Sequence, residues 1–156
     1  MRTISARRLL VVGAVVLVLG AGAAPPPAQS GSASSAQRTP TEVSRSIAKR
    51  YLAAAIAKTT SKVVWSSLYA PNVVVVDGTN GETLKGIDTN LRVWREWLRS
   101  NPGLRITGSV WCAGPFWAVV NVTEQTSSML HRAVSILEIG NGLIVHETDY
   151  YETTSR

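Results

Sequence analysis

The chain has 156 residues, with 16 lysines and arginines against 10 aspartates and glutamates, which gives a formal net charge of +6 at pH 7. This length allows one domain with a substantial core. Residues 1–30 contain three arginines and no acid, so the remainder carries 13 − 10 = +3, spread over scattered basic residues. That spacing excludes the dense basic stripe of a nucleic-acid-binding surface, and the single cysteine, Cys112, excludes a disulfide within the chain.

The first 30 residues predict a secretory signal peptide. Three arginines precede an apolar run from Leu9 to Leu19, and small residues follow it. The alternative is an uncleaved N-terminal membrane anchor, although the run is shorter than the roughly 20 apolar residues of a membrane span. A Ser/Ala-rich linker over residues 31–40 then leads to the domain, residues 41–156. We therefore expect a secreted or otherwise extracytoplasmic domain.

Three helices are predicted in the first half of the domain. The segment Thr39–Glu42 has the pattern of a capping box, and apolar residues then recur at a spacing of four up to about Lys58. A second, shorter helix is predicted for residues 62–70. A third begins at an N-cap, Asp88, and ends at the stop signal of residues 101–103.

Between the second and third helices, Val73–Val76 predict a short strand that is buried on both faces. The run ends on Asp77, and Gly78 follows. An acid at the end of a buried strand can be partly desolvated, which raises its pKa and suits it to proton transfer. The alternative is that Asp77 caps a turn, because Asp-Gly is a common turn pair.

The rest of the chain predicts β structure. A short strand is expected at residues 82–85, and long strands at 104–112, 116–125, 130–139 and 143–152, the last two joined by an Asn-Gly hairpin. Helices followed by a meander of antiparallel strands form an α+β layout. We expect a cone-shaped α+β barrel, in which three N-terminal helices pack on a strongly curved, mostly antiparallel sheet and enclose an apolar cavity.

The final strand carries a group of acids. Strand alternation places Val145, Glu147, Asp149 and Tyr151 on one face, and His146, Thr148 and Tyr150 on the other. If the first set faces the cavity, Glu147 and Asp149 line it opposite Asp77. Carboxylates that share a pocket of low dielectric repel, so the pKa of one of them would rise. If the register is reversed, these acids form a solvated edge and His146 faces inward.

Several segments together resemble one known superfamily. They are Arg50–Ala54, Leu68–Asp77, Gly81–Gly86, Val93–Trp97 and Val134–Ile139. In this order they resemble the nuclear transport factor 2-like superfamily, and within it the SnoaL-like and ketosteroid isomerase-like branch, over essentially the whole domain. The resemblance implies the fold described above. It implies no single activity, because this superfamily hosts isomerases, cyclases, hydrolases and binding modules.

The resemblance also implies roles for individual residues. The steroid isomerases use an acid at the position of Asp77 as the proton-transferring base, and a tyrosine at the position of Tyr51 as an oxyanion donor. Their second donor, a protonated aspartate, aligns with Ser135, which can donate a hydrogen bond but cannot replace that acid. The SnoaL-like polyketide cyclases place a catalytic acid at the position of Asp149. The candidate catalytic residues are therefore Asp77, Asp149 and Tyr51.

The resulting hypothesis is an exported protein that binds a small hydrophobic molecule through Trp94, Ala133, Ser135, Glu147 and Tyr151. As an enzyme it would catalyse isomerisation or aldol-type cyclisation of a polyketide- or steroid-like carbonyl compound, with a carboxylate base and without a cofactor. The alternative is a non-catalytic extracytoplasmic module for ligand binding or dimerisation. We expect a homodimer, no nucleic-acid partner, and membrane contact only through an uncleaved N-terminal segment.

No metal site is expected from the histidines. His131 and His146 lie on different predicted strands, with no cysteine or acid at ligand spacing. Two isolated histidines of this kind are more often structural than metal ligands.

Overall fold

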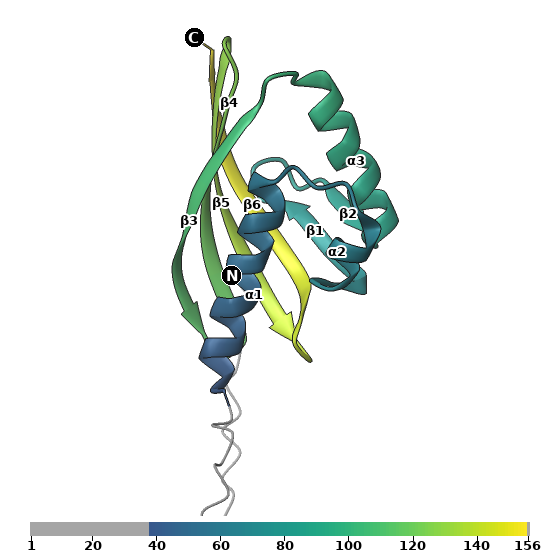
Figure 1. The fold of residues 1–156 in the computed structure, drawn as a ribbon, viewed down its shortest axis with the longest axis vertical. Coiled ribbons are helices and arrows are strands. Elements are labelled where there is room, and N and C mark those ends of the chain that lie inside the picture. The colour runs from purple at the N-terminus through teal and green to yellow at the C-terminus, as the bar shows by residue number, and fades with distance from the viewer. Residues whose placement is uncertain (1–37, 156) are drawn as a thin grey trace, which may run out of the picture. The chain divides into compact units, whose positions relative to one another are not determined.

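The computed structural model describes residues 38–155 (Figure 1). The predicted leader and most of the predicted linker lie outside the described residues. The elements are α1 (Pro40–Ile56), α2 (Lys62–Ser66), β1 (Tyr69–Asp77), β2 (Thr83–Lys85), α3 (Ile87–Ser100), β3 (Arg105–Gly114), β4 (Trp117–Gln125), β5 (Met129–Gly140) and β6 (Leu143–Ser155). Within this part of the chain, none of the helices has the length and apolarity that a membrane crossing requires.

The six strands form one mixed sheet in the order β2-β1-β6-β5-β4-β3. β1 pairs in parallel with β6, and every other neighbouring pair is antiparallel. The helices lie on one side of this sheet, α1 against β3 and β4, and α3 against β1 and β2 (Figure 1). The α+β architecture with a strongly curved sheet is therefore confirmed. The sheet curls over the helices without closing into a full barrel.

The predicted capping box sets the start of α1. Thr39 Oγ1 accepts the Glu42 backbone N–H at 3.3 Å, and Glu42 Oε2 accepts the Thr39 backbone N–H at 2.7 Å. From this fixed start, a spacing of four brings Ile47 and Tyr51 to the face that packs on the sheet, where they are 4% and 8% exposed. The cap therefore determines that the Tyr51 hydroxyl points toward the concave side of the sheet.

Two predicted boundaries differ from the structure. α2 ends at Ser66 and not near Ala70, because the chain already pairs with β6 at this point: the Leu68 carbonyl accepts the Ile144 N–H at 2.7 Å. Tyr69 consequently begins β1. The N-cap of α3 is Gly86 and not Asp88, and Gly86 adopts φ +80°, a conformation that favours glycine.

The valine strand is buried less completely than predicted. Val73 is fully buried, but Val74, Val75 and Val76 are partly exposed. The reason is their place in the sheet, because β1 has only the three-residue β2 between it and the edge.

Candidate functional site

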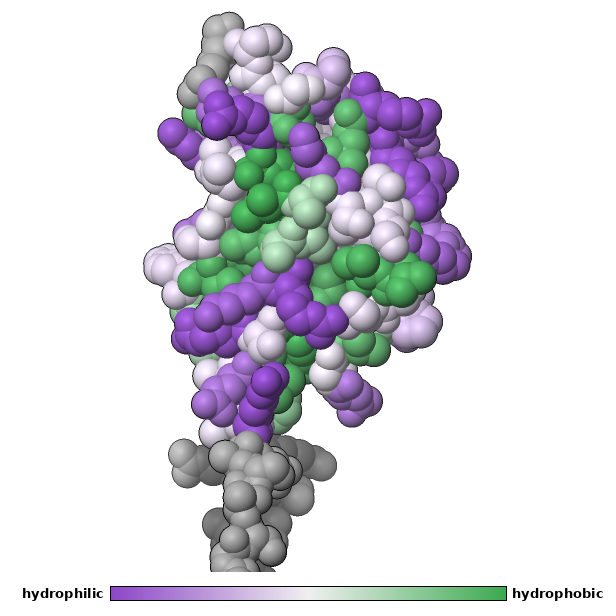
Figure 2. All heavy atoms as spheres, viewed as in Figure 1, coloured by the Kyte–Doolittle hydropathy of each residue, from purple (hydrophilic) through white to green (hydrophobic). Residues whose placement is uncertain are grey.

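A cavity of about 610 Å³ lies between the concave face of the sheet and the helices. Its walls are mostly apolar or aromatic and include Tyr51, Trp65, Tyr69, Leu91, Trp94, Trp97, Val122 and Met129. The exposed residues Glu82 and Thr153 also line it, so the cavity reaches the surface on their side. In Figure 2, apolar side chains (green) gather in the middle of the molecule, beside the hydrophilic outer surface of α3. A cavity of this size fits a small organic molecule.

A bulge in β6 decides which of its side chains enter the cavity. The pairing of β6 with β5 shifts by one residue near Val145, which is left out of the ladder and is 39% exposed. Ile144 and Glu147 therefore both face inward, at 0% and 2% exposed. Beyond the bulge, normal alternation brings Asp149 and Tyr151 to the same face. The prediction that Val145 shares this face is wrong.

Two tyrosines hold the carboxyl group of Glu147. Tyr51 Oη, from α1, donates to Oε1 at 2.6 Å, and Tyr69 Oη, from β1, donates to Oε2 at 2.5 Å. Tyr51 Oη also lies 3.4 Å from Ser135 Oγ on β5. The ring of Trp65 stacks on that of Tyr69 with the centroids 5.3 Å apart, which fixes the Tyr69 ring in this orientation.

Glu147 and Asp149 form a carboxyl pair, in which Glu147 is buried and Asp149 is half-buried with a buried Oδ1. Burial raises the pKa of Glu147 well above its usual range, and the charge of Asp149 raises it further. Burial also raises the pKa of Asp149, and hydrogen bonds with Ser135 and Glu147 offset part of that increase. Like charges that share a cavity of low dielectric repel, so the pair keeps a proton to a higher pH than two separate carboxyl groups would. Asp149 Oδ1 is buried and has no hydrogen-bond partner within residues 38–155.

Asp77 lies at the cavity wall beside Asp149 and not opposite it, because β1 and β6 pair in parallel at these two residues. Its Oδ1 accepts the backbone N–H groups of Thr79 and Asn80 at 2.8 Å and 3.2 Å, and the Tyr151 hydroxyl donates to Oδ2. Desolvation raises the pKa of Asp77, but the hydrogen bonds together lower it more, and the net pKa lies below the usual value. The expected increase in pKa is therefore wrong at Asp77, which caps the turn after β1.

The remaining predicted binding residues line the same cavity. Trp94, Ala133, Ser135 and Tyr151 are all part of its wall. The ring of Trp94 is held in place because its Nε1 donates to the Thr59 carbonyl at 3.0 Å.

Only one of the two histidines lies at the cavity. His131 borders the cavity, and His146 does not. Among the described residues, no three His, Cys, Asp or Glu side chains are grouped closely enough to hold a metal ion.

Tyr69 and Glu124 are among the cavity residues that the sequence-based candidates do not include. The sequence pattern assigns Tyr69 to the second helix, and alternation along β1 does not locate it, because the pairing of β1 with β6 shifts between Tyr69 and Val74. Glu124 continues the alternation of Val120 and Val122 in β4, so it also faces inward, and its Oε2 accepts the indole N–H of Trp97 at 3.0 Å. The useful signal for Glu124 is therefore strand periodicity carried into the polar end of β4, whereas Tyr69 has no such signal in the sequence.

Comparison with solved structures identifies the fold. A ketosteroid isomerase-like protein from Kribbella flavida matches with a TM-score of 0.64 at 24% identity, over 73% of this chain and 81% of that chain. A SnoaL-like protein of unknown function from Burkholderia thailandensis matches with a TM-score of 0.59 at 17% identity, over 71% and 95% of the two chains. An LEH-like epoxide hydrolase from M. tuberculosis matches with a TM-score of 0.56 at 11% identity, over 72% and 84%.

No protein-family model and no curated protein matches the chain. The structural matches therefore confirm the resemblance at the level of the fold: the described domain has the nuclear transport factor 2-like fold that SnoaL-like and ketosteroid isomerase-like proteins share. At these identities, activity has to be argued from the residues of this chain.

Proposed function

We propose that the protein is a general acid/base enzyme that moves a carbon-bound proton on a small, mainly apolar carbonyl compound, without a cofactor. The observation that carries this proposal is the carboxyl pair at the wall of an apolar cavity: Glu147 is buried, Asp149 is half-buried, and the buried Oδ1 of Asp149 is unpartnered among the described residues. Carboxyl groups with raised pKa values are suited to proton transfer near neutral pH.

The two acids have different roles in this proposal. Asp149, with a free oxygen at the cavity, acts as the base and removes a proton from the carbon next to the substrate carbonyl. The electron pair of the broken C–H bond forms a C=C bond, and negative charge develops on the carbonyl oxygen. Returning the proton to another carbon completes an isomerisation. Alternatively, the enolate carbon attacks a second carbonyl of the same molecule and forms a C–C bond, and the proton held by Asp149 passes to the resulting alkoxide, which completes an aldol cyclisation.

Glu147 keeps the proton of the carboxyl pair and supports the tyrosine hydroxyl donors. Burial favours the neutral carboxylic acid. Both tyrosine hydroxyls donate to Glu147 in the structure. When substrate is bound, the carboxylic O–H of Glu147 instead donates a hydrogen bond to the oxygen of Tyr51 or Tyr69. The hydroxyl proton of that tyrosine is then free to bond to the developing oxyanion. Ser135, 3.4 Å from the Tyr51 oxygen, is a further donor on the same side. Preorganised hydrogen-bond donors stabilise such an anion more strongly than water does when the cavity has a low dielectric.

Asp77 is left out of this mechanism. Its lowered pKa and its hydrogen bonds to the turn and to Tyr151 make it a weak base whose lone pairs are largely occupied. The fold likeness to ketosteroid isomerase-like and epoxide hydrolase-like proteins supports a catalytic use of the cavity. We propose Asp149, and not Asp77, as the base.

Deuterium exchange tests this proposal with simple ketones in place of a natural substrate. The purified protein is incubated in D2O with cyclic ketones of increasing size, up to a steroid enone, and loss of the proton signals next to the carbonyl is followed by NMR. We expect exchange with at least one compound, and its loss in Asp149→Asn. Glu152 is a solvent-exposed acid on the opposite face of β6, so Glu152→Gln is the matched control. Ketone exchange with this variant should be as fast as with the wild type.

The alternative function is a non-catalytic module for binding an apolar ligand. Binding of a ketone without exchange in the wild type would support it, and so would exchange that is equally fast in Asp149→Asn. A circular dichroism spectrum of Asp149→Asn that matches the wild type is needed to attribute lost exchange to the missing base.

A further inference from the structure

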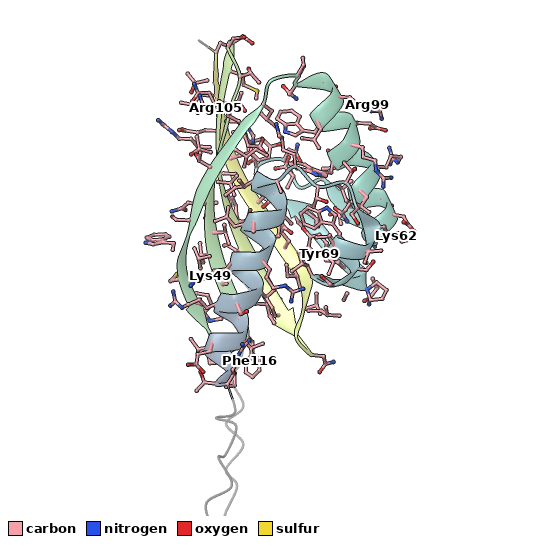
Figure 3. All side chains as sticks on the ribbon, in the orientation of Figure 1. Lys49, Lys62, Tyr69, Arg99, Arg105 and Phe116 are labelled. Atoms are coloured by element: carbon pink, nitrogen blue, oxygen red, sulfur yellow. The ribbon has the colours of Figure 1, made fainter. Side chains whose placement is uncertain are left out.

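The charges of the domain are distributed unevenly around the cavity. Five of the ten acidic residues of the chain line it: Asp77, Glu82, Glu124, Glu147 and Asp149. No lysine or arginine of residues 38–155 does so. Figure 3 labels Lys49, Lys62, Arg99 and Arg105, which are all exposed. A domain with an excess of basic residues thus has a cavity whose charged side chains are all acidic.

Three aromatic rings accompany these acids on one side of the cavity. The centroid of the His131 ring lies 5.8 Å from that of Trp97 and 4.7 Å from that of Tyr151. Glu124 accepts a hydrogen bond from Trp97, and Asp77 accepts one from Tyr151. A carboxyl group is therefore hydrogen-bonded to the ring at each end of this row. Burial lowers the pKa of His131, which favours the uncharged ring despite the opposing effect of Asp77.

A row of aromatic rings bordered by the carboxyl groups of Glu124 and Asp77 is chemically suited to a cation. The negative face of an aromatic ring attracts an ammonium group, and the attraction grows when water is excluded. The unpartnered Asp149 Oδ1 adds a buried acceptor in the same cavity with no cationic partner among the described residues. A carboxylate or phosphate in this position would meet acidic side chains and no lysine or arginine of residues 38–155, and it would lose its hydration without compensation.

We propose that the cavity selects a hydrophobic cation, a molecule with an apolar ring body and one protonated amine, and that it rejects carboxylates and phosphates of the same shape. In this arrangement the apolar body contacts the walls around Trp65 and Trp94, and the amine lies near Glu124 and Asp77. This inference rests on the proposed use of the cavity as a ligand site, and it narrows the carbonyl substrate to an amino ketone or a similar amine.

Three probes of one shape test the charge preference. They are 2-naphthylmethylamine, 2-naphthylmethanol and 2-naphthoate, which share a ring system and differ in charge. Isothermal titration at low ionic strength and near neutral pH gives the three dissociation constants. We expect the amine to bind about tenfold more tightly than the alcohol or better, and the carboxylate to bind more weakly than the alcohol. Equal binding of all three, tighter binding of the carboxylate, or no binding of any would overturn the inference.

Variants locate the preference in the cavity. Glu124→Gln should reduce the ratio of amine to alcohol affinity at least threefold, by a charge effect that added salt also weakens. Asp77→Asn, which keeps an acceptor for the turn, gives a second measurement if Glu124→Gln does not fold. Glu152→Gln removes an exposed acid outside the cavity and should leave the ratio unchanged. A ratio that no cavity variant changes would refute the placement.

The charge preference of binding is measured independently of the deuterium-exchange test. Selective amine binding together with exchange that survives in Asp149→Asn would preserve this inference and refute the proposed base. Exchange that depends on Asp149, together with tightest binding of the carboxylate probe, would support the proposed base and refute this inference.

Discussion

The pH dependence of folding stability tests the state of Glu147 directly. Burial raises the pKa of this group well above its usual range in the folded protein. The unfolded chain releases the same proton near its ordinary pKa of about 4.3. Above that pH the folded state binds more protons than the unfolded state, so the contribution of Glu147 to stability is full below about pH 4 and is lost as the pH rises through the folded pKa.

The perturbation is Glu147→Gln. The amide does not titrate, but it can still accept a hydrogen bond from one tyrosine and donate one to the oxygen of the other. One extra bound proton corresponds to a slope of about 1.4 kcal/mol per pH unit in the free energy of unfolding. We expect the variant to gain stability relative to the wild type as the pH rises from about 5 to about 8, by up to that slope.

Urea unfolding at several pH values measures this difference, with tryptophan fluorescence as the signal because Trp65 is buried beside the site. Burial also raises the pKa of Glu124 and lowers that of His131, but both groups are present in the two proteins, so their contributions largely cancel in the difference. Glu152→Gln, whose wild-type side chain is 69% exposed, should run parallel to the wild type.

Parallel curves for Glu147→Gln and the wild type would refute the reasoning, because they would mean that the two tyrosines keep Glu147 ionised in spite of burial. If Glu147→Gln does not fold, Asp149→Asn replaces it. Removing the Asp149 charge should lower the pKa of Glu147 and flatten the same dependence, since that charge is the second cause of the increase.

Three further predictions concern the fold and the assembly. Gly108→Ala should lower the free energy of unfolding by about 1–3 kcal/mol in urea titrations, because the added Cβ would lie 2.2 Å from the Asn121 carbonyl oxygen; unchanged stability would contradict this backbone approach. Thr39→Ala should cost about 1 kcal/mol through loss of the cap, and a cost near zero would mean that the capping box contributes little. The exposed apolar side chains Trp117 and Ile136 on the outer face of the sheet support the proposal of a homodimer with a second copy. Light scattering should then show a dimer for the wild type and a monomer for Ile136→Glu, and a monomeric wild type would end that proposal.

Local sequence signals determine where several elements of this protein begin and turn. The capping box at Thr39 and Glu42 predicts the start of α1, and the structure contains both of its hydrogen bonds. The Asn141-Gly142 pair predicts the hairpin between β5 and β6, and both residues have the positive φ that such a turn needs. These features could be predicted because each depends on neighbours within four residues.

The tertiary structure alone decides which acid is held in the cavity. The sequence places Asp77 at the end of a buried strand, but a tyrosine 74 residues further on donates to it and its pKa falls. Glu147 enters the cavity through a one-residue bulge, and its tyrosine partners lie 96 and 78 residues away. A shift of one residue in a strand reverses the face of every side chain that follows. Alternation along the last strand predicted that one of the carboxyl groups sharing the cavity would have a raised pKa, as Glu147 has. The pKa of each group depends on partners that only strand register brings together, and for that reason the increase expected at Asp77 was wrong.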